Sequence, residues 1–302
     1  MTRIGCLGEV MIELALDGDA ARVGVAGDTY NTAVYLRRLL GGGVCYVTAL
    51  GDEAMSARIL DAMRAEGLSD ALVERRPGMS PGLYAISTDA AGERSFSYWR
   101  SASAARTLFA EPCAVGPDRL LDLDLVVLSG ISLAILPQPA REALRGALAR
   151  LRARGGRVAF DSNHRPRLWE SPEAARRETA ALWALTDIGL PSLDDETALF
   201  GDADEAAVLA RLRDAGVRTG ALKRGAAGPV GLMGEERGRI WPEAPRVVDT
   251  TAAGDSFGAG FLAALSRGAD VGAAMEAGHA LAREVVGHRG AILPAGRPEP
   301  MA

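Results

Sequence analysis

VDTTAAGDSFGAGF, residues 248–261, is the stretch that most narrows the fold and the chemistry of this chain. Small residues lead directly into an amphipathic helix, so Ala252, Ala253 and Gly254 leave its first N–H groups uncovered. Those groups and the helix dipole can hold a phosphate or a developing negative charge. Asp255 stands beside this anion site, where a carboxylate can accept the proton of an attacking hydroxyl in phosphoryl transfer. From the motif alone, a capping aspartate in an Ala/Gly-rich helix start explains these residues equally well.

On the N-terminal side of this stretch, apolar strands alternate with Ala-, Leu- and Arg-rich helical segments of crossover length. The expected strands are 125–128, 158–160, 188–190 and 220–222. This rhythm predicts a parallel, doubly wound sheet covered by helices. Two more helices, after Gly254 and after Val271, are expected near the end of the chain.

The N-terminal third follows a less regular pattern. Strands are expected at 3–8, 11–16 and 44–50 and helices at 28–40 and 54–66, with a glycine- and alanine-containing loop after residue 16. Asp28 or Thr29 can cap the first helix, and the glycines at 41–43 stop it. Two β-rich runs within 83–99 flank the turn sequence DAAG, which is typical of a hairpin. The chain is therefore expected to form one α/β domain with a small β accessory.

Composition bounds the classes of function. The chain has 302 residues, of which 48% are hydrophobic and 24% charged, as in an ordinary soluble enzyme. Its 34 Lys and Arg against 39 Asp and Glu give a net charge of −5, and without a long basic run nucleic acid is not an expected partner. Membrane insertion and export are not expected, because no uncharged apolar stretch of about 18 residues occurs. Cys6, Cys45 and Cys113 show neither disulfide nor zinc spacing, which fits the cytoplasm.

The common phosphoryl-transfer signatures do not occur in the sequence: it has no G-x-x-x-x-G-K-[ST] motif and no H-R-D or D-F-G signature. Residues 249–261 instead resemble the C-terminal signature of the PfkB, or ribokinase-like, family of carbohydrate kinases. The turn AGDTYNTA at 26–33 is similar to the family's N-terminal signature, with Ala26 where a first glycine is usual. The resemblance implies a ribokinase-like α/β fold: a doubly wound, mostly parallel sheet flanked by helices, with a small β-sheet lid.

Within that family the chain resembles the 2-keto-3-deoxygluconate kinases over nearly its whole length. The segments that carry this likeness are 27–36, 46–51, 81–84, 92–100, 161–169 and 289–294. The resemblance implies one kinase domain over residues 1–302, with a lid formed discontinuously by about 9–24 and 82–100. Lids of this family often pair between subunits, which implies a homodimer or a higher homo-oligomer.

The same resemblance implies an activity: ATP-dependent phosphorylation of the 6-hydroxyl of 2-keto-3-deoxy-D-gluconate. Asp255 would be the base, and the backbone of Ala252, Ala253 and Gly254 would hold the charge of the transferred group. The gluconate and galactonate forms of the acid are not distinguished.

The residues that the resemblance places at the sugar suit a small acid. Arginine forks bind carboxylate or carbonyl oxygens, and tyrosines add a hydroxyl to an apolar ring. Without the resemblance, the Tyr-Trp-Arg run at 98–100 is explained by cross-strand packing with a solvated arginine, and Asp28 and Asn31 by cap and helix roles. The predicted sugar-binding residues are Gly27, Asp28, Asn31, Tyr84, Tyr98, Arg100, Arg165 and Asp255.

Lys223 is the only lysine among the 34 basic residues, and it opens the glycine-rich turn KRGAAG at 223–228. That turn is similar to the nucleotide-side turn of the family, where backbone and a basic group approach the phosphates or ribose of ATP. Without the family, Lys223 is a turn lysine and His279 a partly buried structural histidine. The predicted ATP-binding residues are Ser192, Lys223, Gly225, Gly228, Gly254 and His279.

The family commonly has an Asn-x-x-Glu segment near the metal and the phosphates. The matching segment here is SLDDE at 192–196, in which Asp195 keeps the spacing better than Glu196. Asp195 is therefore the predicted contact to Mg²⁺, through water, because magnesium keeps several of its waters. An N-cap role at the start of the helix from 194 to 199 explains these acids equally well. Binding of a monovalent cation near 249–251 stays undecided.

Two rival functions fit the same fold, because a fold alone does not determine function. One is a kinase for a neutral sugar such as fructose or ribose, which Arg100 and Arg165 together disfavour. The other is a non-catalytic sugar-binding regulator, which an intact Asp255 and glycine turn disfavour.

Overall fold

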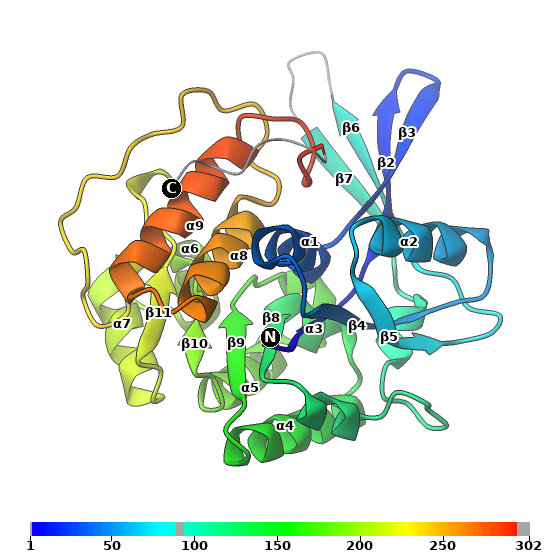
Figure 1. Ribbon diagram of the computed structural model, residues 1–302, viewed down its shortest axis with the longest axis horizontal. Coiled ribbons are helices and arrows are strands. Elements are labelled where there is room, and N and C mark those ends of the chain that lie inside the picture. Colours follow the sequence, from blue (N-terminus) through cyan, green and yellow to red (C-terminus); the bar gives the residue numbers. More distant parts are fainter. Residues whose placement is uncertain (1, 89–93, 295–302) are drawn as a thin grey trace.

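The computed structural model describes residues 2–88 and 94–294. Its centre is an eight-stranded sheet with the order β12-β11-β10-β9-β8-β1-β4-β5 (Figure 1). Neighbouring strands are parallel except β11 and β12, so the predicted doubly wound, mostly parallel sheet is confirmed. The strands are β1 (Ile4–Leu7), β4 (Val44–Leu50), β5 (Ser69–Arg75), β8 (Leu125–Ser129), β9 (Arg157–Asp161), β10 (Ile188–Gly189), β11 (Thr219–Leu222) and β12 (Val230–Gly231).

The strand order reverses at β1, which lies between β8 and β4. The chain runs outward from β1 through β4 to β5, then returns to β8 and continues outward on the other side to β12. Connections on the two sides of β1 therefore leave the carboxyl edge of the sheet in opposite directions. In open α/β sheets, such a reversal opens a crevice where ligands bind.

Helices cover both faces of the large sheet (Figure 1). One face carries α1 (Asp28–Leu40), α2 (Ala54–Ala65), α8 (Ala253–Ser266) and α9 (Val271–Val285), and the opposite face carries α3 (Gly130–Ile135), α4 (Gln138–Ala153), α5 (Pro172–Trp183), α6 (Leu193–Phe200) and α7 (Glu205–Asp214). Short 3₁₀ turns are η1 (Ala104–Thr107), η2 (Pro117–Asp122), η3 (Pro166–Leu168) and η4 (Gly225–Ala227). In β8, Val127 packs with the first set of helices, and Val126 and Leu128 pack with the second. Burial on both faces explains the uninterrupted apolar runs of the central strands.

A separate four-stranded sheet, in the order β3-β2-β6-β7, stands next to α1 and α2 (Figure 1). Its strands are β2 (Met11–Asp17), β3 (Ala20–Ala26), β6 (Gly82–Thr88) and β7 (Arg94–Trp99). The predicted hairpin is confirmed as β6 and β7, although its turn at 89–92 lies outside the described residues. Residues 20–26 were expected as a loop, and that prediction is wrong. They form β3 because Val23 and Val25 alternate toward an apolar cluster. Only Gly24 separates these two valines, and the small residues around them make the period of two hard to recognise in the sequence.

The start of α1 differs from the prediction. α1 begins directly after Gly27, and no side chain caps it. The prediction that Asp28 or Thr29 caps this helix is therefore wrong. Instead, the Asp28 carboxylate accepts hydrogen bonds from the side chains of Ser129 and Asn163. These contacts hold Asp28 at the carboxyl edge of the large sheet.

Gly220 of β11 occupies a position where a side chain does not fit. Its φ is 140°, and a Cβ there would lie 1.9 Å from the carbonyl oxygen of Gly189 in β10. We expect Gly220→Ala to lower the free energy of unfolding by about 3 kcal/mol, because a buried sheet cannot relax the overlap. In the control Gly146→Ala in α4, a Cβ meets nothing within 4 Å, and stability should rise by about 0.5–1 kcal/mol. Urea denaturation measures both, and equal stabilities would contradict this expectation.

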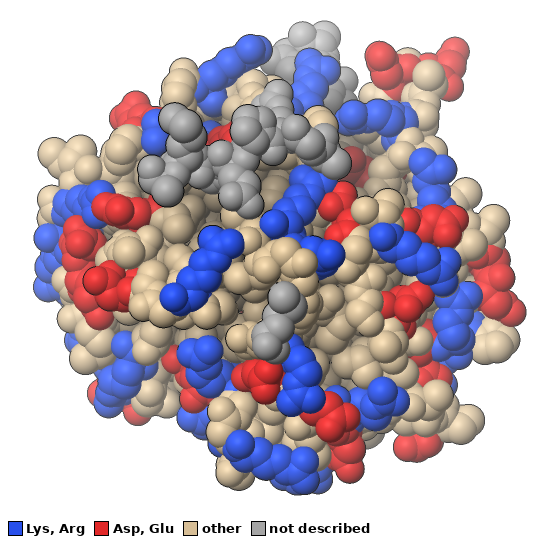
Figure 2. Space-filling model, viewed as in Figure 1, with Lys and Arg blue, Asp and Glu red and all other residues tan. Residues whose placement is uncertain are grey.

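Charged side chains of both signs are interspersed on the face of the molecule shown in Figure 2, and neither sign gathers there into a continuous stripe. That face therefore lacks the basic surface that follows a nucleic-acid backbone. Within residues 2–88 and 94–294, no helix has the length and the apolar character that crossing a bilayer requires.

Candidate active site

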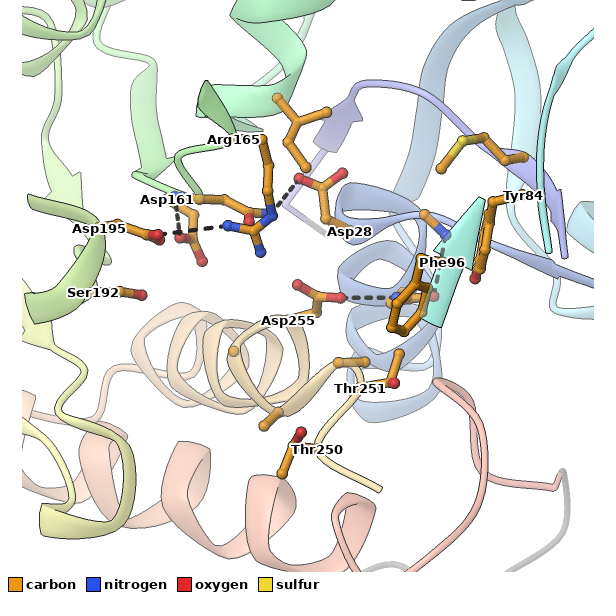
Figure 3. A pocket seen from close by; sticks show the side chains of 18 of the residues that line it. Asp28, Tyr84, Phe96, Asp161, Arg165, Ser192, Asp195, Thr250, Thr251 and Asp255 are labelled. Carbon is orange, nitrogen blue, oxygen red and sulfur yellow. Dashed lines mark hydrogen bonds and ion pairs between the residues drawn. The ribbon is translucent and has the colours of Figure 1, made fainter. Parts of the chain in front are cut away.

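A cavity of 530 Å³ opens at the carboxyl edge of the large sheet and is bounded on one side by the small sheet (Figure 3). Predicted site residues that line it are Gly27, Asp28, Asn31, Tyr84, Tyr98, Arg100, Arg165, Ser192, Asp195, Lys223, Ala252, Ala253, Gly254 and Asp255. Residues that the sequence analysis did not assign to the site also line it: Met11, Phe96, Ile131, Asp161, Asn163, Thr250 and Thr251. The fold thus brings the sugar-side and phosphate-side predictions into one cavity.

α8 presents its N-terminus to this cavity. Ala252, the residue before the helix, has a φ of 62° and a ψ of 15°, and no side chain caps the helix. This left-handed conformation is strained for an alanine. Asp255 lies in the first turn of α8 and does not cap it, so the capping explanation of the motif is wrong. The Ala253 N–H donates to the carbonyl oxygen of Thr250 at 3.2 Å. The N–H groups that α8 can offer to an anion are therefore those of Gly254 and Asp255.

The Asp255 carboxylate is held by an amide from α1. Asn31 Nδ2 donates a hydrogen bond to Asp255 Oδ2 at 2.8 Å. Burial raises the pKa of Asp255 well above its ordinary value and the neighbouring Asp28 raises it further, while the hydrogen bond from Asn31 opposes both effects. A raised pKa makes the ionised carboxylate a stronger proton acceptor. Asn31 therefore fixes the direction of this acceptor as well as lining the cavity.

Asp28 faces the same cavity (Figure 3). Its Oδ2 accepts hydrogen bonds from the Ser129 hydroxyl and, at 2.8 Å, from Asn163 Nδ2. Ser129 ends β8, and Asn163 follows the end of β9. Sequence reasoning missed both partners. A signal was present, because polar residues stand directly at the carboxyl ends of two buried strands, and these ends meet at one edge of a parallel sheet.

Lys223 directly follows β11 and forms an ion pair with Asp161, the last residue of β9. A Cβ on Gly254 would lie 3.3 Å from Lys223 Nζ, so the ammonium group lies beside the N-terminus of α8. A cation at this place adds to the positive end of the helix dipole. Lys223 and α8 together form an anion site whose charge Asp161 balances.

A smaller cavity of 120 Å³ adjoins this anion site. Lys223 and Gly254 line both cavities, and the predicted ATP-binding residues Gly225, Gly228 and His279 line the smaller one. The residues predicted to bind ATP therefore line two adjoining cavities that share Lys223.

His279 is also tied to the surrounding structure. Its Nε2 lies 2.8 Å from the carbonyl oxygen of Pro242, and its ring centre lies 5.0 Å from that of Trp241. Burial lowers the pKa of His279, and nearby arginines lower it further. A neutral ring at pH 7 then donates to Pro242. The structural role that the sequence left open for His279 is present, and the ring also lines the smaller cavity.

The small sheet closes one side of the larger cavity with aromatic side chains. Tyr84 lies opposite Tyr98 with ring centres 5.7 Å apart, and Phe96 lies 6.4 Å from each. Cross-strand packing, one of the explanations left open by the sequence, therefore occurs. The solvated arginine expected with it does not: Arg100 is 9% exposed and pairs with the buried Glu9. Glu9 neutralises the charge of Arg100.

Arg165 differs from Arg100 in exposure and in its partner. The Arg165 side chain is 54% exposed, and its Nη1 lies 3.5 Å from Asp195 Oδ1 (Figure 3). An exposed ion pair of this length contributes little free energy. The Arg165 guanidinium can therefore turn to an incoming anion more readily than that of Arg100.

The family to which the chain belongs follows from comparison with known proteins. A family model described as pfkB family carbohydrate kinase matches residues 1–297. This chain belongs to the PfkB family. The family resemblance and the ribokinase-like fold predicted from the sequence are confirmed.

The chain is also similar to individual proteins of known name and to solved structures. The PfkB chain is 44% identical to a protein named 2-dehydro-3-deoxygluconokinase from Dickeya dadantii, over 96% of each chain. It is 43% identical to a protein of the same name from Escherichia coli K12, over 97% of each chain. Aminoimidazole riboside kinase from Salmonella enterica, solved with aminoimidazole riboside and an ATP analog, matches with a TM-score of 0.80 and 25% identity, over 96% of this chain and 95% of that one.

The two acids of the metal-side segment in this PfkB chain point in different directions. Asp195 lines the larger cavity, and burial raises its pKa. Glu196 is buried away from the cavity, where it accepts from Arg211 Nη2 at 2.7 Å and burial raises its pKa to about 7. The N-cap role considered for these acids is wrong, because α6 begins at Leu193 without a side-chain cap.

Magnesium fits this PfkB site through water. Within residues 2–88 and 94–294, no group of three or more His, Cys, Asp and Glu side chains is placed to hold a metal ion. Asp161 and Asp195 do line the cavity, and each is paired with a cation. Such scattered oxygen donors suit Mg²⁺, which takes few protein ligands and keeps several waters.

Proposed function

We propose that this carbohydrate kinase uses ATP to phosphorylate the 6-hydroxyl of 2-keto-3-deoxy-D-gluconate, giving 2-keto-3-deoxy-6-phosphogluconate. The observation that carries the proposal is that one cavity holds both the Asp255 carboxylate, at the uncapped N-terminus of α8, and the exposed Arg165 guanidinium. The first suits activation of a hydroxyl, and the second suits binding of a carboxylate. The relatives named 2-dehydro-3-deoxygluconokinase support the same substrate.

In this proposal, Asp255 accepts the proton of the 6-hydroxyl while the hydroxyl oxygen bonds to the γ-phosphorus of ATP. The bond from that phosphorus to the β–γ bridging oxygen breaks, and ADP leaves. Backbone N–H groups of Gly254 and Asp255, together with the helix dipole, stabilise the charge on the transferring oxygens. Lys223 adds a positive charge beside them, and Asn31 keeps the base in place.

Other parts of the proposal concern magnesium and the small sheet. Mg²⁺, held through water by Asp195, would neutralise phosphate charge. The lid predicted at 9–24 and 82–100 would close over the sugar and exclude water that otherwise hydrolyses ATP. The cytoplasmic location, the homodimer and the monovalent cation stay predictions.

A second candidate is a kinase of the same family for a neutral sugar such as fructose or ribose. The ion pair of Arg100 with Glu9 favours it, because this pair removes one of the two cations expected for an acid. Arg165 is then the group on which the choice between acid and neutral sugar depends.

ATP turnover by the purified protein with Mg²⁺ tests the proposal. The acceptors are 2-keto-3-deoxygluconate, its galactonate epimer, fructose and ribose. Turnover of the sugar acid supports the proposal, whereas turnover of fructose or ribose alone supports the second candidate. Binding of the sugar acid without consumption of ATP would instead indicate a non-catalytic regulator.

Replacing Lys223 with methionine is expected to raise the KM for ATP about tenfold and to leave the KM for the sugar acid within about twofold. The reason is that Lys223 lies beside the N-terminus of α8, where the phosphates bind in this proposal. Arg154→Met, on the exposed end of α4, is the matched control for loss of a positive charge. Steady-state kinetics with each substrate varied in turn measures the effect. An unchanged KM for ATP in Lys223→Met contradicts the assignment.

A further inference from the structure

Glu13 is a buried carboxylate behind the aromatic wall of the small sheet. It lies on β2, is 8% exposed, and does not line the cavity. Its Oε2 accepts a hydrogen bond from the hydroxyl of Tyr84, which does line the cavity. In the described part of the chain, no Arg, Lys or His forms an ion pair with Glu13. Burying a carboxylate without a cation costs free energy unless hydrogen bonds compensate the lost hydration. The hydrogen bond from Tyr84 provides such compensation for Glu13.

The register of the strands places Glu13 against Tyr84. β2 pairs with β6 so that Glu13 stands opposite Tyr84, and β6 pairs with β7 so that Tyr84 stands opposite Tyr98. Opposite residues share one face of a sheet, so this row leads from the buried carboxylate to the exposed ring of Tyr98. On the other side of β2, strand β3 places Gly24 opposite Glu13, and a Cβ on Gly24 would lie 3.3 Å from Glu13 Oε1. The glycine leaves room for the carboxylate.

We infer that Glu13 is a positioning residue that holds the Tyr84 hydroxyl as a hydrogen-bond acceptor for the sugar. A phenol has one proton, and Tyr84 gives it to Glu13, so toward a substrate its oxygen can only accept. A sugar hydroxyl can donate to that oxygen, whereas a carboxylate or keto oxygen cannot. Glu13 therefore directs a hydroxyl-bearing part of the substrate to the small sheet and leaves the acid group to Arg165. The inference rests on the proposed function for its substrate.

Two substitutions at Glu13 separate positioning from packing. Glu13→Leu replaces the carboxylate with an apolar side chain and so removes the hydrogen-bond acceptor. Glu13→Gln keeps an acceptor oxygen. We expect Glu13→Leu to raise the KM for the sugar acid about tenfold with kcat and the KM for ATP within about twofold. Glu13→Gln should restore the KM to within about threefold of the wild type. Asp17→Asn, an exposed acid on the same strand, is the control and should change none of these constants.

A double variant tests whether Glu13 acts through Tyr84. In the Tyr84→Phe background, which lacks the hydroxyl, Glu13→Leu should raise the KM no further. The same tenfold rise in that background, or no rise in the wild-type background while thermal unfolding shows the variant folded, overturns the inference. Failure of the proposed function can be told apart from failure of this inference, because the wild-type protein would then turn over only a neutral sugar. The cycle is then run on the KM of that sugar, and its outcome decides the role of Glu13.

Discussion

Asp255→Asn is expected to lower kcat for the sugar acid about 10³-fold while the protein stays folded and binds the sugar acid. The substitution removes the proton acceptor and keeps the size of the side chain, so Asn31 can still donate a hydrogen bond to residue 255. General base catalysis by a positioned side chain contributes roughly 10²- to 10⁴-fold. Initial rates of ADP formation measure kcat, and calorimetry of sugar-acid binding without ATP measures the affinity.

The matched control for Asp255→Asn is Asp194→Asn, which removes an exposed acid from the first turn of α6. Its kcat should stay within about twofold of the wild type. If Asp255→Asn retains more than a tenth of wild-type kcat, Asp255 is not the base. If it loses sugar-acid binding altogether, the carboxylate serves chiefly to hold the substrate.

Arg165→Gln is expected to lower kcat/KM for the sugar acid about 100-fold and to leave kcat/KM for any neutral sugar that is turned over within about threefold. A guanidinium binds a carboxylate through charge-assisted hydrogen bonds, which glutamine cannot replace. Arg165 is 54% exposed and only loosely paired with Asp195, so its charge is available to a ligand. Steady-state kinetics with the sugar acid, fructose and ribose measures the ratio.

Two comparisons sharpen this result. Arg167→Gln removes an exposed arginine of the adjacent 3₁₀ turn and should leave kcat/KM within about twofold. Arg100→Gln should instead lower the unfolding midpoint, because it leaves the buried Glu9 without its cation. An unchanged kcat/KM in Arg165→Gln would refute the acid-recognition role and favour the neutral-sugar candidate.

The fold was predictable where burial produces a recognisable pattern of apolar residues within a short segment. Strands β8 and β9 are covered by helices on both faces and therefore appear as continuous apolar runs. Helix α1 ends as predicted, because Gly41 adopts a φ of 73° that stops it. β5 was not predicted, because it is an edge strand and its sequence SDALVER is half polar. β12 was not predicted either, because two residues are too short for a periodic signal.

The candidate site was predictable in part. Asp255 and the small residues before it lie within one helical turn, so local sequence shows that an anion site and a carboxylate coincide. The amide that holds Asp255 comes from Asn31, 224 residues away in the sequence. Ser129 and Asn163 are likewise 101 and 135 residues from Asp28. Such partners depend on which strand ends meet, which no local pattern specifies.

By itself, the sequence determined the α/β class, the open N-terminus of α8 and the family signatures, because these depend on residues close together in the chain. Only the tertiary structure decided which charges are free. Arg100 meets the buried Glu9, and Glu196 turns away to Arg211, while Arg165 stays exposed at the cavity. The physical reason is that the availability of a charge depends on burial and on its partner, and both are set by packing between distant segments.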